Sequence, residues 1–369
     1  MPRYWPIRSY AESERTRILE RLLDLRHALD EKVARARPDS LLLATWNIRD
    51  FDSNKFGHGP RLPESFHYIA EIISRFDLVA IQEVNRDLTP LRRLMHLLGE
   101  DWDYIVTGVT EGVSGGEERM AFAYNRRRVR FNNLAGQVVL PKTRLVTTPG
   151  QAGDGLQFAR APYLASFQAG WFKFNLSTVH IYYGNDTGEK LQRRIDEIRK
   201  IAGHFKSLQE KEPADYILLG DFNIVSPEHQ TMQALSANGF LIPEPLQGFK
   251  TNLGRNKYYD QIAFRPYDKR LEFGSAGVFD FRDGVFRPED FPAYFDKMPP
   301  HLRDVHTAGA KKGQPRTEAE QRNYYNREWI TWQMSDHLLL WVELRVDFTN
   351  DYLRSLLPGE TPLAEGGTV

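Results

Sequence analysis

The feature that most constrains this chain is a short apolar segment that runs into polar residues, Tyr216-Ile-Leu-Leu-Gly220-Asp221-Phe-Asn223. An apolar segment of this length that meets a glycine predicts a strand buried on both faces of a sheet. Asp221 and Asn223 follow at its carboxyl end, where binding sites of α/β sheets commonly lie. Gly, Asp and Asn are also frequent in plain turns, so a simple strand-to-turn connection is the alternative for this segment alone.

Apolar segments elsewhere in the chain begin or end in polar residues in the same way, and helical patterns lie between them. The predicted strands cover residues 40–47, 77–83, 118–124, 164–168, 171–181, 216–220, 259–264 and 338–344. The spacing of apolar residues predicts helices within 11–37, 63–76, 88–98 and 191–205. Strands that alternate with helices, together with a hairpin, favour an α/β fold with two mixed sheets packed face to face and helices outside.

The order of these elements suggests one large domain with additions. Residues 1–38 are predicted to be a helical extension, because five apolar residues form one stripe there: Ile18, Leu22, Leu25, Leu29 and Val33. We expect this helix to pack on the outside of the domain, with partner binding as the alternative. The domain itself covers 39–349, and 350–369 form a C-terminal tail. An insert without a regular period, 265–334, is expected to form part of the substrate-binding wall.

Composition limits the chemistry that such a domain can perform. Lys+Arg and Asp+Glu each number 49, so the chain has no strong basic field and any contact with nucleic acid must be local. No cysteine is present, which excludes disulfides, thiolate metal sites and a cysteine nucleophile. The sequence shows no signal-peptide pattern and no long apolar stretch, so we expect a cytoplasmic protein without stable membrane association. Nothing in the sequence indicates a partner protein.

The polar residues at the ends of predicted strands form a chemically coherent set: Asn47, Glu83, Glu118, Arg160, His180, Asp221, Asn223, Asp260, Asp336 and His337. They offer carboxylate and amide oxygens for Mg²⁺, imidazoles for proton transfer and a donor for phosphate oxygens. This set indicates metal-assisted phosphodiester hydrolysis. A histidine that transfers protons needs a carboxylate on its second ring nitrogen, and Glu118 and Asp260 are the candidates for His180 and His337. The other eight histidines are interpreted as structural or surface residues.

Eight short motifs carry a resemblance to a known family. They are Trp46-Asn47-Ile48-Arg49, Ile81-Gln82-Glu83-Val84, Glu118-Arg119, Arg160-Ala-Pro, Val179-His180, Gly220-Asp221-Phe222-Asn223, Tyr259-Asp260-Gln261-Ile262 and Ser335-Asp336-His337. Together, and in this order over roughly 41–346, they resemble the endonuclease/exonuclease/phosphatase superfamily, and within it the DNase I-like branch. The resemblance implies a four-layered α/β sandwich that cleaves phosphoester bonds with Mg²⁺, for which Mn²⁺ can substitute.

The resemblance also implies roles for individual residues. Glu83 is the principal metal ligand, with Asn47 and Asp336 nearby. Asp221 and Asn223 position the attacking water and the phosphate.

The remaining roles concern proton transfer and the phosphate. By the resemblance, His180 is oriented by Glu118, and His337 is paired with Asp260. Arg160 resembles the phosphate-contacting arginine of the family. Arg49 and Asn47 are further candidates for phosphate binding.

Departures from DNase I itself concern the way it holds DNA. DNase I inserts an arginine and a tyrosine into the DNA minor groove. The position of the arginine corresponds here to Asn85, with Arg86 next to it, and the position of the tyrosine corresponds to Gly116, so the tyrosine is missing. The disulfides of that family are also missing. The leading prediction is a nuclease, with DNA favoured over RNA as the substrate. The alternative is a phosphatase or a phospholipid phosphodiesterase of the inositol-phosphate or sphingomyelin type. A catalytically inactive scaffold is the least favoured, because no catalytic position has been lost.

Overall fold

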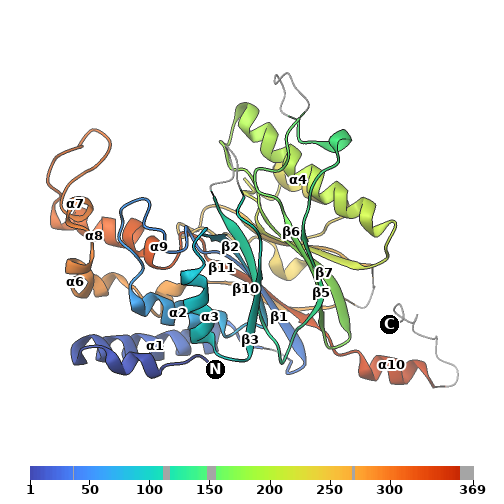
Figure 1. The fold of residues 1–369 in the computed structure, drawn as a ribbon, viewed down its shortest axis with the longest axis horizontal. Coiled ribbons are helices and arrows are strands. Elements are labelled where there is room, and N and C mark those ends of the chain that lie inside the picture. The colour runs from blue at the N-terminus through green and yellow to red at the C-terminus, as the bar shows by residue number, and fades with distance from the viewer. Residues whose placement is uncertain (36, 111–116, 148–154, 268–270, 358–369) are drawn as a thin grey trace.

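The computed structural model describes residues 1–35, 37–110, 117–147, 155–267 and 271–357 (Figure 1). Gly116 and most of the predicted C-terminal tail lie outside these ranges.

The described strands form two mixed sheets, as expected from the sequence. The first sheet has the order β10-β11-β1-β2-β4-β3, and the second has the order β5-β6-β7-β8-β9. The first sheet consists of β1 (Ser40–Asn47), β2 (Leu78–Val84), β3 (Trp102–Val106), β4 (Arg119–Asn125), β10 (Phe273–Phe279) and β11 (Leu339–Arg345). The second consists of β5 (Arg130–Gln137), β6 (Tyr163–Ala169), β7 (Phe172–His180), β8 (Asp215–Asp221) and β9 (Asp260–Arg265).

Each sheet contains one parallel pair joined by a long helix. In the first sheet β1 is parallel to β2, and α2 (Pro63–Ile73) connects them. In the second sheet β7 is parallel to β8, and α4 (Gly188–Gln209) connects them. Parallel neighbours need such crossovers, and the crossover brings the carboxyl ends of both strands to the same edge. Each sheet therefore presents two strand ends side by side.

The elements stack in four layers (Figure 1). Leu43, Phe122, Phe167 and Leu219 belong to the apolar core between the sheets. A second core lies between the first sheet and the helices α1 (Glu12–Lys32), α2 and α3 (Thr89–Leu98). A third lies between the second sheet and the helices α4 and α5 (Gln230–Ser236). The predicted four-layered α/β sandwich is confirmed.

The N-terminal helix packs as the sequence indicates. All five residues of the apolar stripe are buried in the same core as the outer face of the first sheet. The helix ends at Lys32, several residues before Pro38. Among the described helices, none combines the length and apolar character that crossing a bilayer requires.

The range expected to be an irregular insert, 265–334, contains regular structure. Its first part includes β10, which pairs antiparallel with β11 at the edge of the first sheet. The remainder forms short helices that lie beside α1 and α2 (Figure 1). They are η4 (Phe281–Asp283), η5 (Pro288–Asp290), α6 (Phe291–Tyr294), η6 (Phe295–Lys297), α7 (Pro300–Arg303), α8 (Glu318–Tyr324), the π-helix η7 (Tyr325–Trp329) and α9 (Ile330–Gln333). Elements this short show no period in the sequence, which explains why the sequence pattern missed them.

Four further short helices complete the described structure: η1 (Trp5–Ser9), η2 (Lys142–Arg144), η3 (Glu244–Leu246) and α10 (Thr349–Ser355).

Candidate active site

The candidate active site forms where the two sheets present their strand ends to each other. In the second sheet His180, Asp221 and Asp260 are direct neighbours across β7, β8 and β9. In the first sheet β1 ends at Asn47, and Glu83 lies in β2 one residue beyond the partner of Asn47. The register of each sheet therefore fixes which side chains meet at this edge.

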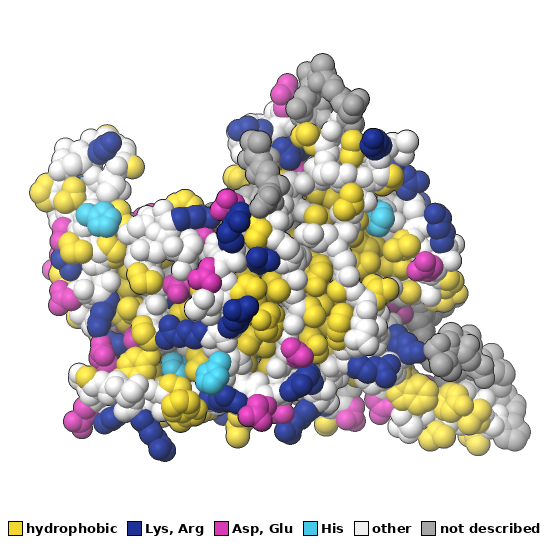
Figure 2. Space-filling model, in the orientation of Figure 1, with side chains coloured by type: hydrophobic (Ala, Val, Ile, Leu, Met, Phe, Trp, Pro, Cys, Tyr) yellow, Lys and Arg dark blue, Asp and Glu magenta, His cyan; other side chains and the backbone are white. Residues whose placement is uncertain are grey.

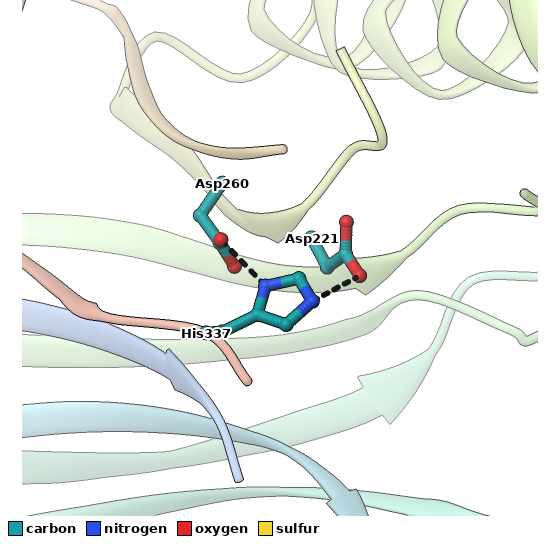
Figure 3. A group of neighbouring side chains, drawn as sticks. All are labelled: Asp221, Asp260 and His337. Atoms are coloured by element: carbon teal, nitrogen blue, oxygen red, sulfur yellow. Dashed lines mark hydrogen bonds and ion pairs between the residues drawn. The ribbon is translucent and has the colours of Figure 1, made fainter. Parts of the chain in front are cut away.

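His337, which comes just before β11, lies between two carboxylates (Figure 3). Its Nδ1 is 2.7 Å from Asp260 Oδ2, and its Nε2 is 3.8 Å from Asp221 Oδ2. Burial disfavours the charged ring, but the attraction of Asp260 and Asp221 outweighs it and raises the pKa of His337 well above its ordinary value. The Tyr259 ring stacks on the imidazole at 5.6 Å between centroids. The structure thus buries His337 between two carboxylates, with Nδ1 on Asp260 and Nε2 directed at Asp221.

His180 has a similar environment on the other side of Asp221. Its Nδ1 is 2.8 Å from Glu118 Oε2, and its Nε2 is 3.6 Å from Asp221 Oδ2. Burial and Arg160 lower the pKa of His180, but Glu118 and Asp221 outweigh them, so the net shift is upward. Both imidazoles therefore carry a carboxylate on Nδ1 and face Asp221 with Nε2.

Arg160 holds Glu118 in place. Its Nε and Nη2 donate to the two oxygens of Glu118 at 2.8 and 2.9 Å, a two-point contact that fixes the carboxylate plane. Burial opposes the charged form of Glu118, but His180 and Arg160 together lower the pKa of this carboxyl to about 2. The guanidinium predicted to contact phosphate thus also supports the carboxylate that orients His180.

Asn47 connects the two sheets. Its Nδ2 donates to Glu83 Oε1 at 2.9 Å and to Asp221 Oδ2 at 3.2 Å, while its Oδ1 accepts from the Arg49 backbone N–H at 3.0 Å. The second oxygen of Glu83 accepts from the backbone N–H of Asp50 at 2.7 Å. The amide of Asn47 thus sets the distance between the predicted metal ligand and the predicted water-positioning carboxylate.

Asn223 supports Asp221 from the following turn. Its backbone N–H donates to Asp221 Oδ1 at 2.9 Å, and its side-chain Nδ2 donates to the carbonyl of Ile181 at 2.9 Å. These bonds hold the end of β8 against the end of β7.

The backbone is strained at several of these positions. Glu83, Asn223 and Arg49 have φ values of 60°, 52° and 50°, in the left-handed region that non-glycine residues rarely adopt. Such strain concentrates where a function requires one side-chain direction.

Gly220, with φ 130°, is a different case, because a Cβ there would lie 2.2 Å from the carbonyl oxygen of Val179. Only glycine lets β8 come close enough to place Asp221 beside His180.

The donor set fits a hard divalent cation. Burial raises the pKa of Glu83, and the charges of Glu118 and Asp336 add to this effect while His180 opposes it. A cation beside Glu83 would relieve this excess of negative charge, and oxygen ligands are those that Mg²⁺ and Mn²⁺ prefer. The Asp336 side chain is 44% exposed and lies 3.7 Å from Arg49 Nη1. Ligand atoms of Asp221, Asp260 and His337 lie within 4.8 Å of one another, so this buried group could also bind a metal.

Two residues that the sequence did not assign to the site help to assemble it. Arg61 is buried and donates to the carbonyls of Ile48, Arg49 and Met334, which joins the loop after β1 to the segment before Asp336. Ser335 donates to the Asn47 carbonyl at 2.6 Å and accepts from the His337 N–H at 2.9 Å. Ser335 belongs to a recognised motif, whereas an arginine in a polar loop carries no sequence signal of burial.

Comparisons with known proteins agree with this architecture. The model of the Endonuclease/Exonuclease/phosphatase family matches residues 44–337. Deoxyribonuclease-1 of Bos taurus is 25% identical over 264 residues, which cover 66% of this chain and 84% of the relative.

Solved structures of similar fold include two proteins from Bacteroides thetaiotaomicron. One is an endonuclease/exonuclease/phosphatase family protein, with a TM-score of 0.53, 20% identity and coverage of 84% of this chain and 98% of the other. The second is a mannosyl-6-phosphatase, with a TM-score of 0.51, 19% identity and coverage of 83% and 99%. The resemblance inferred from the motifs is confirmed. This chain belongs to the endonuclease/exonuclease/phosphatase family, whose members are hydrolases of phosphoester bonds.

Proposed function

We propose that this protein is a Mg²⁺-dependent phosphodiesterase that hydrolyses nucleic acid, with DNA as the leading substrate. The observation that carries the proposal is the pair of carboxylate-held imidazoles, His180 and His337, on either side of Asp221. The similarity to a deoxyribonuclease at the sequence level supports a nucleic-acid substrate.

The side chains of this chain divide the chemistry between them. Asp221 lies where a carboxylate can orient the attacking water and accept its proton. The Nε2 atoms of His180 and His337 face the same space and can donate to phosphate oxygens, which favours the charge of the transition state. One of the two imidazoles protonates the leaving oxygen.

The metal complements these residues. Glu83, with Asp336 and Asn47, would hold Mg²⁺ or Mn²⁺, and the bound ion neutralises phosphate charge. Arg49 and Arg160 are the further candidates for phosphate contact, together with Asn223.

The test is a substrate panel with the purified protein and Mg²⁺: labelled duplex DNA, single-stranded DNA, RNA, phosphomonoesters, and inositol-phosphate and sphingomyelin substrates. His337→Ala is the inactive comparison, and His27→Ala, at a side chain that is 76% exposed, is the matched control. We expect internal cleavage of a DNA strand by the wild type and by His27→Ala, and a large loss in His337→Ala. Turnover confined to phosphomonoesters or phospholipids would overturn the proposal in favour of the alternative chemistry.

A further inference from the structure

A group of aromatic side chains lies against the predicted phosphate-binding residue Arg49. The guanidinium carbon of Arg49 is 3.8 Å from the centroid of the Trp332 ring, and its Nη1 is 3.7 Å from Asp336 Oδ2. The rings of His58 and Phe56 lie 4.6 and 5.0 Å from that of Trp332. We call Phe56, His58 and Trp332 the aromatic wall. Arg49, which lies over the Trp332 ring, also contacts the candidate metal ligand Asp336.

The aromatic wall comes from two segments that both lead into the active site. Phe56 and His58 belong to the loop that follows β1, and Trp332 belongs to α9, just before Asp336. Arg49 also contacts the hydroxyl of Thr331, which fixes α9 against the loop. The π-helix η7 directly precedes α9, and π-helical turns are often found at functional sites because they re-aim the side chains that follow.

The aromatic wall is only partly covered by the protein. Phe56 is 56% exposed and Trp332 is half-buried. His58 stacks on Trp332 with 10° between the ring planes, and burial together with Arg49 lowers its pKa to about 4, so its ring is neutral at neutral pH. Lys55 lies 5.1 Å from the Phe56 ring. An exposed ring next to stacked rings, with two cations near it (Lys55 paired with Asp50, and Arg49 with Asp336), suits a planar group that carries a phosphate.

We propose that the aromatic wall is a stacking subsite for an unpaired base of the nucleotide next to the scissile phosphate. This inference rests on the proposed nuclease function. A base in a duplex has both faces covered by its neighbours, whereas a base in a single strand can turn out and stack on Phe56. The protein therefore prefers single-stranded or frayed nucleic acid over intact duplex. Arg49 contributes a positive charge for the neighbouring phosphate.

The test combines a protein variant with a substrate variant. Phe56→Ala removes an exposed ring, and an oligonucleotide with one abasic position next to the cleaved bond removes its partner. Each change alone should raise KM for the single strand by about 5- to 150-fold, as expected for one stacked base, with a smaller effect on kcat. The two changes together should cost little more than one alone, because both remove the same contact.

Controls separate the outcomes of this experiment. Trp171→Ala removes a 49% exposed ring in the turn between β6 and β7, at the other end of the sandwich, and should leave KM unchanged. Equal KM values for wild type and Phe56→Ala, or multiplicative effects of Phe56→Ala and the abasic position, would refute the subsite and leave the nuclease function standing. Absence of cleavage of every nucleic acid by the wild type would refute both.

Discussion

At the scale of single residues, the two histidines of the candidate active site differ from His67 in what their rings contact. His180 and His337 are buried, and each has a carboxylate close to Nδ1, at 2.8 and 2.7 Å. His67 is equally buried, but burial and Arg93 lower its pKa to about 4. Burial and a neighbouring cation thus lower the pKa of a histidine, whereas a carboxylate partner raises it.

The contribution of His180 and His337 to turnover can be measured directly. We expect His180→Ala and His337→Ala each to lower kcat by about 10² to 10⁴, the usual value of a positioned proton donor. If both act on one transition state, the double variant should lose far less than the product of the single losses. Asp260→Asn should reproduce part of the His337→Ala loss. Near-normal turnover by either single variant, at saturating substrate and Mg²⁺, would remove that histidine from the mechanism.

The neutral ring of His67 makes a prediction about stability. Its pKa is about 4 when folded and 6.5 in the unfolded chain, so between these values the unfolded state binds more protons. The free energy of unfolding should therefore fall as the pH drops from 6.5 to 4, with His67 contributing on the order of 3 kcal/mol. Urea denaturation across this range should show a shallower pH dependence for His67→Gln. The exposed His27→Gln is the control, and an unchanged slope in His67→Gln would contradict the assignment.

At the scale of elements, long segments with a clear period could be predicted from the sequence, and short or exposed ones could not. The strands that carry the candidate site residues are apolar and buried, so their ends were found within one or two residues. β5, Arg130–Gln137, was missed because most of it is exposed and lacks an apolar face. β10 was missed because glycine and serine interrupt its apolar residues. The basic residues at 126–128 form a charged turn, in which Arg127 pairs with Asp101.

The residues of the candidate site also fall into those that could be predicted from the sequence and those that could not. Its polar side chains could be found because each follows or precedes a recognisable strand. The supporting contacts could not, because they join residues far apart in the chain, as Arg61 joins the β1 loop to Met334. The aromatic wall belongs to this second class. Phe56 lies near the start of the domain sequence and Trp332 near its end, and neither belongs to one of the eight motifs.

One close contact between elements is open to a simple test. Gly284 follows η4, and a Cβ added there would lie 2.4 Å from the Cα of Leu25 in α1. Backbone on both sides leaves no room to adjust, so Gly284→Ala should separate the segment from α1 and lower the free energy of unfolding by about 1–3 kcal/mol. Gly136→Ala in β5, where a Cβ would meet nothing within 4 Å, is the control. Equal stability of the two variants in urea would show that this contact gives way easily.

At the scale of the whole molecule, the candidate site belongs to neither sheet alone. Glu83 and Asn47 come from the first sheet, whereas His180, Asp221 and Asp260 come from the second. The hydrogen bond from Asn47 to Asp221 crosses from the first sheet to the second, and Asn47 also donates to Glu83 within the first sheet. The surface seen in Figure 2 mixes Lys and Arg with Asp and Glu, in keeping with equal numbers of each sign in the chain. The chain thus has no net charge that would attract a polyanion from a distance.

A metal held by Glu83, Asn47 and Asp336 should stabilise the folded protein. We expect EDTA to abolish activity, and Mg²⁺ at 100 times its Kd to raise the free energy of unfolding by about 2.7 kcal/mol. Glu83→Ala should lose most turnover and most of this stabilisation, yet keep a cooperative melting transition. Thermal melts with and without Mg²⁺ measure both effects. Full activity after exhaustive chelation would contradict the metal requirement, and loss of the cooperative transition in Glu83→Ala would make Glu83 structural.

The pairing of β1 with β11 means that the first sheet can be completed only late in the synthesis of the chain. The two strands are neighbours in the first sheet although roughly 290 residues separate them in the chain. At translation rates of 5–20 residues per second, β11 is synthesised about 15–60 s after β1. His337 emerges from the ribosome in the same interval, directly before β11. A growing chain therefore lacks one of its two candidate catalytic imidazoles until the first sheet can close.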